Sequence, residues 1–174
     1  TPEKSPITSW AYSILGQIYV VLPLALLGVW GYKSDYQLFM NTEYLLMALF
    51  VFVWTNDTGA YIVGCTLGKH RLFERISPKK SWEGFFGGLA FCIILASLAN
   101  YIIPGMLSTA QWIGMGILTS IFSTWGDLCE SLLKRTAGVK DSGKILPGHG
   151  GILDRFDSEL IASPVIFIYL TFVL

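Results

Sequence analysis

Long apolar stretches alternate with short charged segments along this chain of 174 residues. No charged side chain occurs in residues 5–32 or in residues 84–126. Because a transmembrane helix needs about 20 mostly apolar residues, the first stretch predicts one such helix. The second stretch predicts two helices, joined at the turn signal Asn-Tyr-Ile-Ile-Pro-Gly of residues 100–105. Residues 44–67 carry no charged side chain apart from Asp57, and residues 160–174 are apolar to the end.

These stretches predict an all-α, polytopic integral membrane protein with about five transmembrane helices in one transmembrane domain, residues 1–174. The spans are expected near 8–32, 44–67, 84–103, 108–126 and 160–174. The composition agrees, because only 14 % of the residues are charged, against about 25 % in soluble domains. The abrupt start and stop of the chain lead us to expect part of a longer membrane protein.

Positive charge gathers in two of the segments between the spans. Five of the twelve Lys and Arg residues lie in 69–80, and five lie in 134–155. The predicted helical hairpin 84–126 separates the two groups, so both fall on one side of the membrane. The positive-inside tendency makes that side cytoplasmic. We therefore expect the segments 68–83 and 127–159 to form catalytic loops on the cytoplasmic face.

Asp57 interrupts an otherwise apolar span. A charge at this depth costs several kcal/mol, roughly, and usually faces a polar cavity or a partner. One interpretation is that Asp57, with Asn56 and Thr58, lines a hydrophilic pocket. The alternative is a structural ion pair with a Lys or Arg of a neighbouring helix.

The first charged segment contains the pair Ser77-Pro78, which predicts a helix start with Ser as N-cap and Pro in the first turn. Lys79 and Lys80 would then lie in the first turn, where cations oppose the helix dipole. A bound anion would make this arrangement favourable, so we expect Ser77, Lys79 and Lys80 to contact phosphate. The remaining basic residues of the segment are interpreted as a positively charged membrane anchor: Lys69, His70, Arg71 and Arg75.

The second charged segment begins with Asp127, Glu130, Ser131 and Lys134, whose spacing places them on one helical face. Such a face can hold a cation together with the phosphate that the cation neutralises. It can equally be a helix end with local ion pairs, and spacing alone leaves both interpretations open.

Glycines recur through residues 138–151, and they let backbone N–H groups approach a ligand closely. Lys140 and Lys144 add positive charge, and the fragment Pro-Gly-His-Gly-Gly presents the imidazole of His149. The glycine spacing is not that of a Walker A loop. We expect this segment to contact phosphate.

Asp154 and Asp157 open the last apolar stretch and would share a helical face. Carboxylates and phosphate oxygens together form the usual shell of Mg²⁺. The alternative is that they complement the helix dipole, which explains one aspartate better than two.

Residues 131–157 resemble the signature of the CDP-diacylglycerol synthase family, also called phosphatidate cytidylyltransferases. The matching positions are Ser131, Lys134-Arg135, Lys140-Asp141, Gly143, Leu146-Pro147, His149-Gly150-Gly151 and Asp154-Arg155-Phe156-Asp157. Residues 57–61 and 77–84 also resemble segments of the bacterial members. The resemblance covers about residues 45–165, which would correspond to the C-terminal part of such an enzyme.

The resemblance implies transfer of a cytidylyl group from CTP to phosphatidate, giving CDP-diacylglycerol and pyrophosphate for phospholipid biosynthesis. It implies Mg²⁺, with room for a second cation, held by Asp127 and Asp154, with Asp141 and Asp157 as second-tier ligands. Lys134 joins the two aspartates as a catalytic residue. The expected substrate-binding residues are Asp57, Ser77, Lys79, Lys80, Arg135, Lys144, His149 and Arg155.

The partners implied are CTP, phosphatidate and the bilayer, with a homodimer left open and no nucleic acid. The location implied is the bacterial inner membrane. The sequence argues against two alternative functions. A CDP-alcohol phosphotransferase would need an Asp-x-x-Asp-Gly-x-x-Ala-Arg array, which the chain lacks. A membrane transporter would show polar residues recurring through its spans, whereas here charge is concentrated in two loops.

Overall fold

The structure is a computed structural model that describes residues 5–31, 42–139, 142–143 and 151–174. Apart from one small hairpin it is helical, as expected. The helices are α1 (Pro6–Gly16), the short π-helix η1 (Gln17–Val21), α2 (Leu22–Gly31), α3 (Thr42–Leu67), α4 (Trp82–Ile102), α5 (Thr109–Thr136) and α6 (Leu153–Val173). The strands β1 (Arg71–Phe73) and β2 (Ser77–Ser81) pair antiparallel between α3 and α4.

Four helical segments of the described chain are long and apolar enough to cross a membrane: Pro6–Trp30, Glu43–Leu67, Trp82–Ile102 and Leu153–Val173. They correspond to four of the predicted spans, although the last begins at 153 rather than 160. The predicted span 108–126 is the first part of α5, which continues to Thr136. This helix is less apolar because it carries Thr119, Ser120 and Ser123, all fully buried against other helices.

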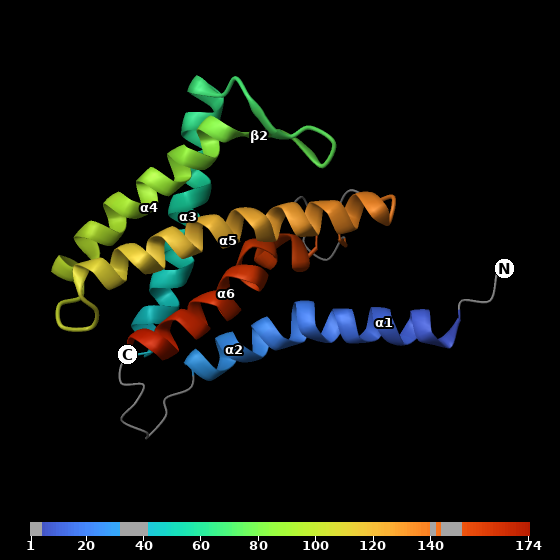
Figure 1. Ribbon diagram of the computed structural model, residues 1–174, viewed down its shortest axis with the longest axis horizontal. Coiled ribbons are helices and arrows are strands. Elements are labelled where there is room, and N and C mark those ends of the chain that lie inside the picture. The colour runs from blue at the N-terminus through green and yellow to red at the C-terminus, as the bar shows by residue number, and fades with distance from the viewer. Residues whose placement is uncertain (1–4, 32–41, 140–141, 144–150) are drawn as a thin grey trace.

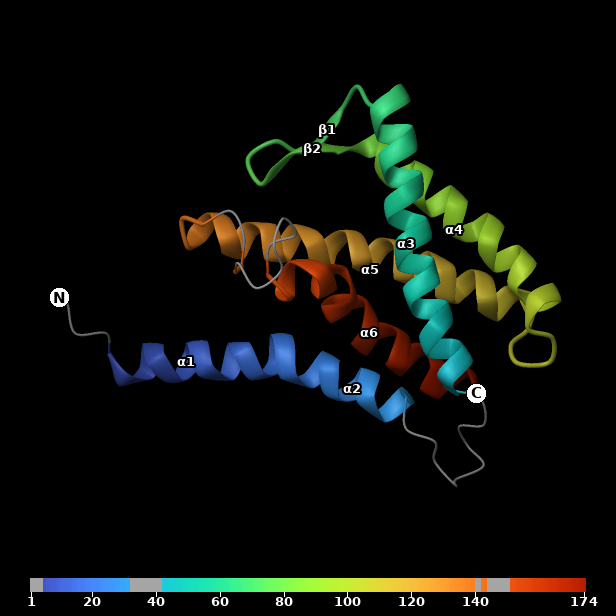
Figure 2. The ribbon, with the colours of Figure 1, turned by 180° about the vertical axis from the view of Figure 1, so that it is seen from behind.

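The helix α5 lies at the centre of the bundle. It packs against α4 on one side and α6 on the other, while α3 packs mainly against α4 and α2 against α6 (Figures 1 and 2). The largest buried side chains of the core include Trp112, Phe52 and Leu49. Of the three free cysteines, Cys92 is buried, whereas Cys65 and Cys129 are exposed.

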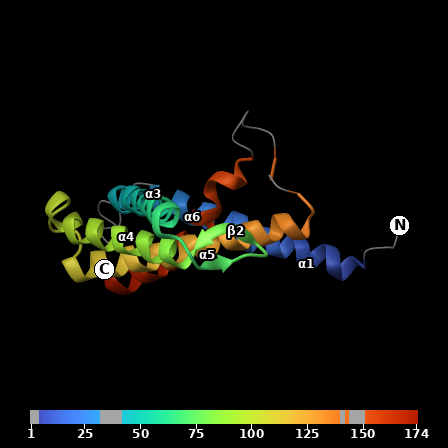
Figure 3. The same cartoon turned by 90° about the horizontal axis from the view of Figure 1, so that it is seen from above.

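The first helix lies apart from this core. In the view from above, α1 extends beyond the other helices (Figure 3), and none of its residues is buried. Its exposed side chains include Ile7, Trp10 and Ile14. An apolar surface of this kind suits contact with lipid chains.

The predicted helix start at Ser77 is wrong. Ser77 begins strand β2, and the N-cap of α4 is Ser81, whose hydroxyl accepts a hydrogen bond from the Gly84 backbone N–H at 3.1 Å. Pro78 disfavours the helical conformation in the residue before it. A start at Ser81 also places Glu83, and no lysine, in the first turn, which suits the helix dipole.

Candidate active site

A polar cavity of about 350 Å³ lies where α3, α4 and α5 meet strand β2. It joins charged and polar side chains from segments far apart in the sequence. Among its lining residues are Asp57, Ser77, Lys79, Lys80 and Asp127. Both charged segments and Asp57 therefore contribute side chains to one pocket.

Lys80 and Asp127 connect the two charged segments directly. The Lys80 Nζ atom lies 2.5 Å from Asp127 Oδ2, and both side chains remain partly exposed to the cavity, by 25 % and 34 %. Ser131, one turn further along α5, donates its hydroxyl to Asp127 Oδ1 at 3.2 Å. Asp127 is thus held in place by two contacts and still faces the cavity.

Beside the cavity, Asn56 fixes α3 against α5. Its Oδ1 atom accepts a hydrogen bond from Ser120 Oγ at 2.6 Å, and its Nδ2 atom donates to Ser123 Oγ at 3.2 Å. The side chain is 2 % exposed, and buried polar groups are stable when they are paired in this way. A Cβ atom at Gly88 of α4 would lie 2.5 Å from Asn56 Oδ1, so the network depends on glycine there.

A second close helix approach joins α5 and α6. A Cβ atom at Gly126 would lie 2.5 Å from the Asp157 carbonyl oxygen, so only glycine lets α5 and α6 approach so closely. Asp157 consequently interacts electrostatically with both Asp127 and Asp57. Lys80 thus contacts Asp127 directly and interacts electrostatically with Asp57 and Asp157.

Lys134 belongs to a separate cluster, further along α5 than Asp127 and Ser131. It pairs with Glu130, one turn earlier, and its Nζ atom lies 2.8 Å from Asp154 Oδ1. Burial alone would lower the pKa of Lys134, but the hydrogen bonds with Asp154 and Glu130 outweigh it and hold that pKa above its usual value. Burial raises the pKa of Glu130, which is 1 % exposed, to about 7, against the opposing effect of Lys134.

The carboxylate of Asp154 already accepts hydrogen bonds from other residues of the protein. Its Oδ2 atom accepts hydrogen bonds from the backbone N–H of Ser142 at 2.9 Å, the Ser142 hydroxyl at 2.9 Å and the Gly151 backbone N–H at 2.7 Å. Together with Lys134 these contacts tie the start of α6 to the glycine-rich segment and to α5. A cation bound at Asp154 would have to displace some of these donors, Lys134 first of all.

The other predicted site residues fall into two groups. Arg135 lines a different cavity, beside the hairpin, and Arg155 lies in the first turn of α6 with its backbone N–H bonded to the Ile152 carbonyl. Lys140, Asp141, Lys144 and His149 lie outside the described residues. Their predicted roles stay predictions.

Sequence reasoning missed two features of this region. The burial of Glu130 and of Glu159, which is 3 % exposed, was not anticipated, since charged residues are almost never fully buried unless paired. Thr124 lines the cavity and was read as part of an apolar span. The spacing of Thr124 three residues before Asp127 could have indicated a shared helical face.

The donor chemistry of the cavity suits a hard divalent cation. Asp57 and Asp127 offer carboxylate oxygens, the ligands that Mg²⁺ prefers, and Asp157 lies close enough to interact electrostatically with both. Within the described residues no three His, Cys, Asp or Glu side chains are close enough to form a complete metal site. Mg²⁺ does not need such a site, because it usually binds one or two carboxylates together with waters and substrate phosphates.

Together the bundle and its cavity define a polytopic helical membrane protein with a charged cavity at one end. The model of the cytidylyltransferase family matches residues 1–173, so the chain belongs to that family.

Curated relatives carry a more specific name. The phosphatidate cytidylyltransferase of Staphylococcus aureus (strain COL) is 41 % identical over 160 residues, which are 91 % of this chain and 61 % of the relative. Those of Staphylococcus haemolyticus (strain JCSC1435) and Staphylococcus epidermidis (strain RP62A) are 41 % and 40 % identical over 159 residues, with the same coverage. The chain thus spans about 61 % of the length of these relatives.

Proposed function

We propose that the protein transfers a cytidylyl group from CTP to phosphatidate, releasing pyrophosphate and forming CDP-diacylglycerol. The observation that carries the proposal is the cavity in which Lys79 and Lys80 of β2 meet Asp127 of α5. It is polar, it lies at the end of membrane-type helices, and it combines cations with carboxylates. Two polyanionic substrates need both kinds of group. The names of the curated relatives support the same reaction.

In this reaction a phosphate oxygen of phosphatidate attacks the α-phosphorus of CTP. A new P–O bond forms as the bond to the β-phosphate oxygen breaks, and pyrophosphate leaves with the electron pair. The phosphate of phosphatidate is already ionised, so no strong general base is required. Catalysis then rests on orienting the two substrates and on neutralising their charge. Lys79 and Lys80 are placed to do this at the cavity, and the protonated Lys134 would act beside it.

Mg²⁺ would supply positive charge that stabilises the negative charge developing on the leaving pyrophosphate. Asp127 is our main candidate for holding it, as expected from the sequence. The arrangement of the carboxylates favours Asp157 and Asp57 as its partners, because Asp154 already accepts from Lys134, Ser142 and Gly151. Asp154 would then hold Ser142 and Gly151 at the start of α6.

We further propose that this end of the bundle faces the cytoplasm of a bacterial cell, in the inner membrane. Both basic segments meet there, as the positive-inside tendency requires. CTP is a charged nucleotide and does not cross a bilayer unaided. A site that uses CTP therefore has to face the cytoplasm.

The test is an assay of the purified protein in detergent with phosphatidate, Mg²⁺ and labelled CTP. We expect CDP-lipid and pyrophosphate in equal amounts. Asp127→Asn should lower turnover by at least about 100-fold, the scale of losing an electrostatic group at a reacting centre, with an unchanged unfolding temperature. Glu43→Gln is the matched control, because Glu43 is an exposed carboxylate in the first turn of α3 and should leave turnover unchanged.

Two outcomes would contradict the proposal. Full turnover by Asp127→Asn would remove the residue from the mechanism, and full turnover in excess EDTA would exclude a divalent cation.

A comparison with Asp157→Asn and Asp154→Asn separates the two roles of the α6 aspartates. We expect the first variant to raise the Mg²⁺ concentration needed for half-maximal rate, and the second to increase protease cleavage near residues 142–151.

A further inference from the structure

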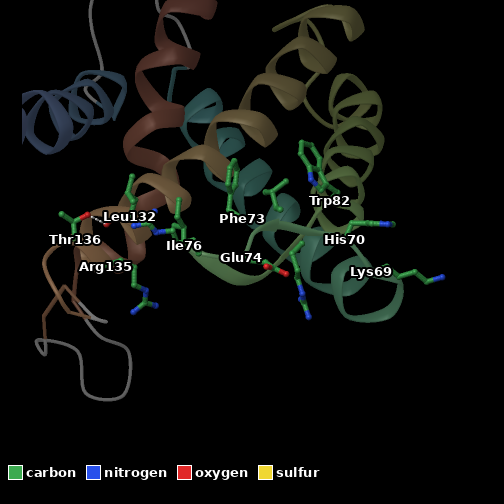
Figure 4. Close-up of a pocket in the computed structure, with 12 residues that line it drawn as sticks. Lys69, His70, Phe73, Glu74, Ile76, Trp82, Leu132, Arg135 and Thr136 are labelled. Carbon is green, nitrogen blue, oxygen red and sulfur yellow. Dashed lines mark hydrogen bonds between the residues drawn. The ribbon is translucent and has the colours of Figure 1, made fainter.

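A second and larger cavity, of about 1450 Å³, lies beside the first. It is bounded by the β1–β2 hairpin and the start of α4 on one side and by the end of α5 on the other (Figure 4). Of the residues that the structure describes, only Leu72 lines both cavities. The proposed reaction makes no use of this second cavity.

The lining of the second cavity is strongly basic. Lys69, Arg71, Arg75 and Arg135 contribute four permanent positive charges, and Glu74 contributes one negative charge. None of these four cations forms an ion pair with a carboxylate of the described residues. The cavity is therefore complementary to an anionic ligand.

Apolar side chains are exposed among these cations. Phe73 is 50 % exposed, Trp82 is 46 % exposed and Leu132 is 48 % exposed, and in Figure 4 Phe73 and Ile76 lie between Trp82 and Leu132. A ligand with only phosphate to offer would leave this apolar surface in water. An amphipathic ligand would cover the apolar surface and the charges together.

The cavity also lies at the depth of a membrane surface. The hairpin connects the end of α3, at Leu67, with the start of α4, at Trp82, and both helices are of membrane-spanning type. Trp82 stacks on Phe86, which is likewise exposed. Exposed aromatic residues of this kind are typical of membrane–water interfaces.

We propose that this cavity binds the headgroup of an anionic membrane phospholipid, with the lipid's glycerol and upper acyl chains against Phe73, Trp82 and Leu132. Such a lipid would fix the hairpin to the membrane surface. Strand β2 carries Lys79 and Lys80 into the first cavity, so lipid binding would also steady those two residues. The binding itself does not depend on the proposed reaction.

Native mass spectrometry of the protein released from detergent tests this proposal. Titration with phosphatidylglycerol or phosphatidylcholine gives an apparent Kd for the first bound lipid. Phosphatidylglycerol is anionic but carries no terminal phosphate that could attack CTP, so it probes the cavity without turnover. We expect it to bind about tenfold or more tightly than phosphatidylcholine, since each nearby Lys or Arg contributes about 1 kcal/mol to attraction of an anionic lipid.

The variants Arg71→Gln and Arg75→Gln should each weaken the first phosphatidylglycerol by about fivefold, the equivalent of one such charge. Lys79→Gln is the matched control, because it removes one charge from the same hairpin but lines the other cavity. It should leave the phosphatidylglycerol Kd unchanged. The side chains of Arg71, Arg75 and Lys79 are all exposed, so we expect the three variants to fold normally. An unchanged unfolding temperature checks this.

Three results would overturn the proposal. Equal weakening by all three variants would show diffuse attraction to a basic surface, and no weakening by either arginine variant would show that the lipid binds elsewhere. Displacement of phosphatidylglycerol by CTP, but not by inorganic phosphate, would assign the cavity to the nucleotide. Retained lipid binding in a protein without cytidylyl transfer would reject the proposed function and leave this inference standing.

Discussion

At the scale of single residues, Asn56 explains how a charged side chain is carried inside a membrane-type helix. Asn56 bonds to Ser120 and Ser123 of α5, and the next residue, Asp57, lines the cavity. The amide therefore fixes the rotation of α3 that brings the carboxylate to Lys80 and Asp127. Of the two interpretations of Asp57 left open by the sequence, a cavity lined by Asp57 is the one that the structure supports.

Replacing Asn56 by Ala should lower the free energy of unfolding by about 1–3 kcal/mol, because the hydroxyls of Ser120 and Ser123 lose a buried partner. Thermal unfolding in detergent measures the change. Ser97→Ala is the control, because the Ser97 hydroxyl bonds only to the Ile93 carbonyl of its own helix. A loss no larger for Asn56→Ala than for Ser97→Ala would show that the network between α3 and α5 is not stabilising.

At the scale of elements, the hairpin and the helix ends decide which cations face which cavity. His70 and Glu83 fasten the hairpin to α4, with His70 Nδ1 2.6 Å from Glu83 Oε1 and the Trp82 backbone N–H donating to the His70 carbonyl at 2.9 Å. As a result Lys79 and Lys80 lie on a strand and line the first cavity, while Arg71 and Arg75 line the second.

The helix boundary can be tested by two serine variants. Ser81→Ala should destabilise the protein by about 1 kcal/mol, since it removes the cap of α4, whereas Ser77→Ala should cost less than about half of that. Unfolding temperatures of the two variants provide the measurement. A larger loss of stability for Ser77→Ala than for Ser81→Ala would instead support the helix start that the Ser77-Pro78 pair predicts.

The contact between α5 and α6 gives a second prediction at this scale. Gly126→Ala would force Asp157 and its helix away from α5, and overpacking of this kind costs about 1–3 kcal/mol. Gly28→Ala is the matched control, because nothing lies within 4 Å of a Cβ atom there and alanine favours the helix. We expect a lower unfolding temperature, and a higher Mg²⁺ requirement, for Gly126→Ala alone.

At the scale of the whole molecule, the two cavities with charged linings lie at one end of the helical bundle. Both cavities lie there, beside the hairpin and the second half of α5. The turn between α4 and α5, around Gly105, lies at the other end of α4 (Figure 1). The proposed reaction joins a water-soluble nucleotide to a membrane lipid. It requires the charged cavity to lie at an end of the bundle, because the two substrates meet only at the membrane surface.

The orientation of this end can be measured by cysteine labelling. In a variant whose three native cysteines are replaced, single cysteines at Glu74, Val139 and Ala110 would be treated with a membrane-impermeant maleimide. In intact cells only the cysteine at 110 should react, and those at 74 and 139 should react after permeabilisation. Labelling of 74 and 139 on opposite sides would contradict the shared face of the two basic segments.

Several features of the site could be predicted from local pattern alone. The face formed by Asp127, Ser131 and Lys134 follows from helical spacing, and contacts along it are present. The hairpin could not be predicted in the same way, because the signal of Ser77-Pro78 suits a helix start as well as a strand, and strand pairing depends on residues outside the local window. The engagement of Asp154 by Ser142 and Gly151 depends equally on how a loop folds back.

By itself, the sequence determined the membrane-type helices, the meeting of two basic segments at one end, and the residues that resemble a cytidylyltransferase signature. These properties follow from hydrophobicity and spacing, which act over a few turns of one helix. Only the tertiary structure decided that Lys80 pairs with Asp127, that Asp154 accepts hydrogen bonds from Lys134, Ser142 and Gly151, and that a second basic cavity adjoins the first. Those outcomes depend on close helix approaches at Gly88 and Gly126, which no single helix specifies.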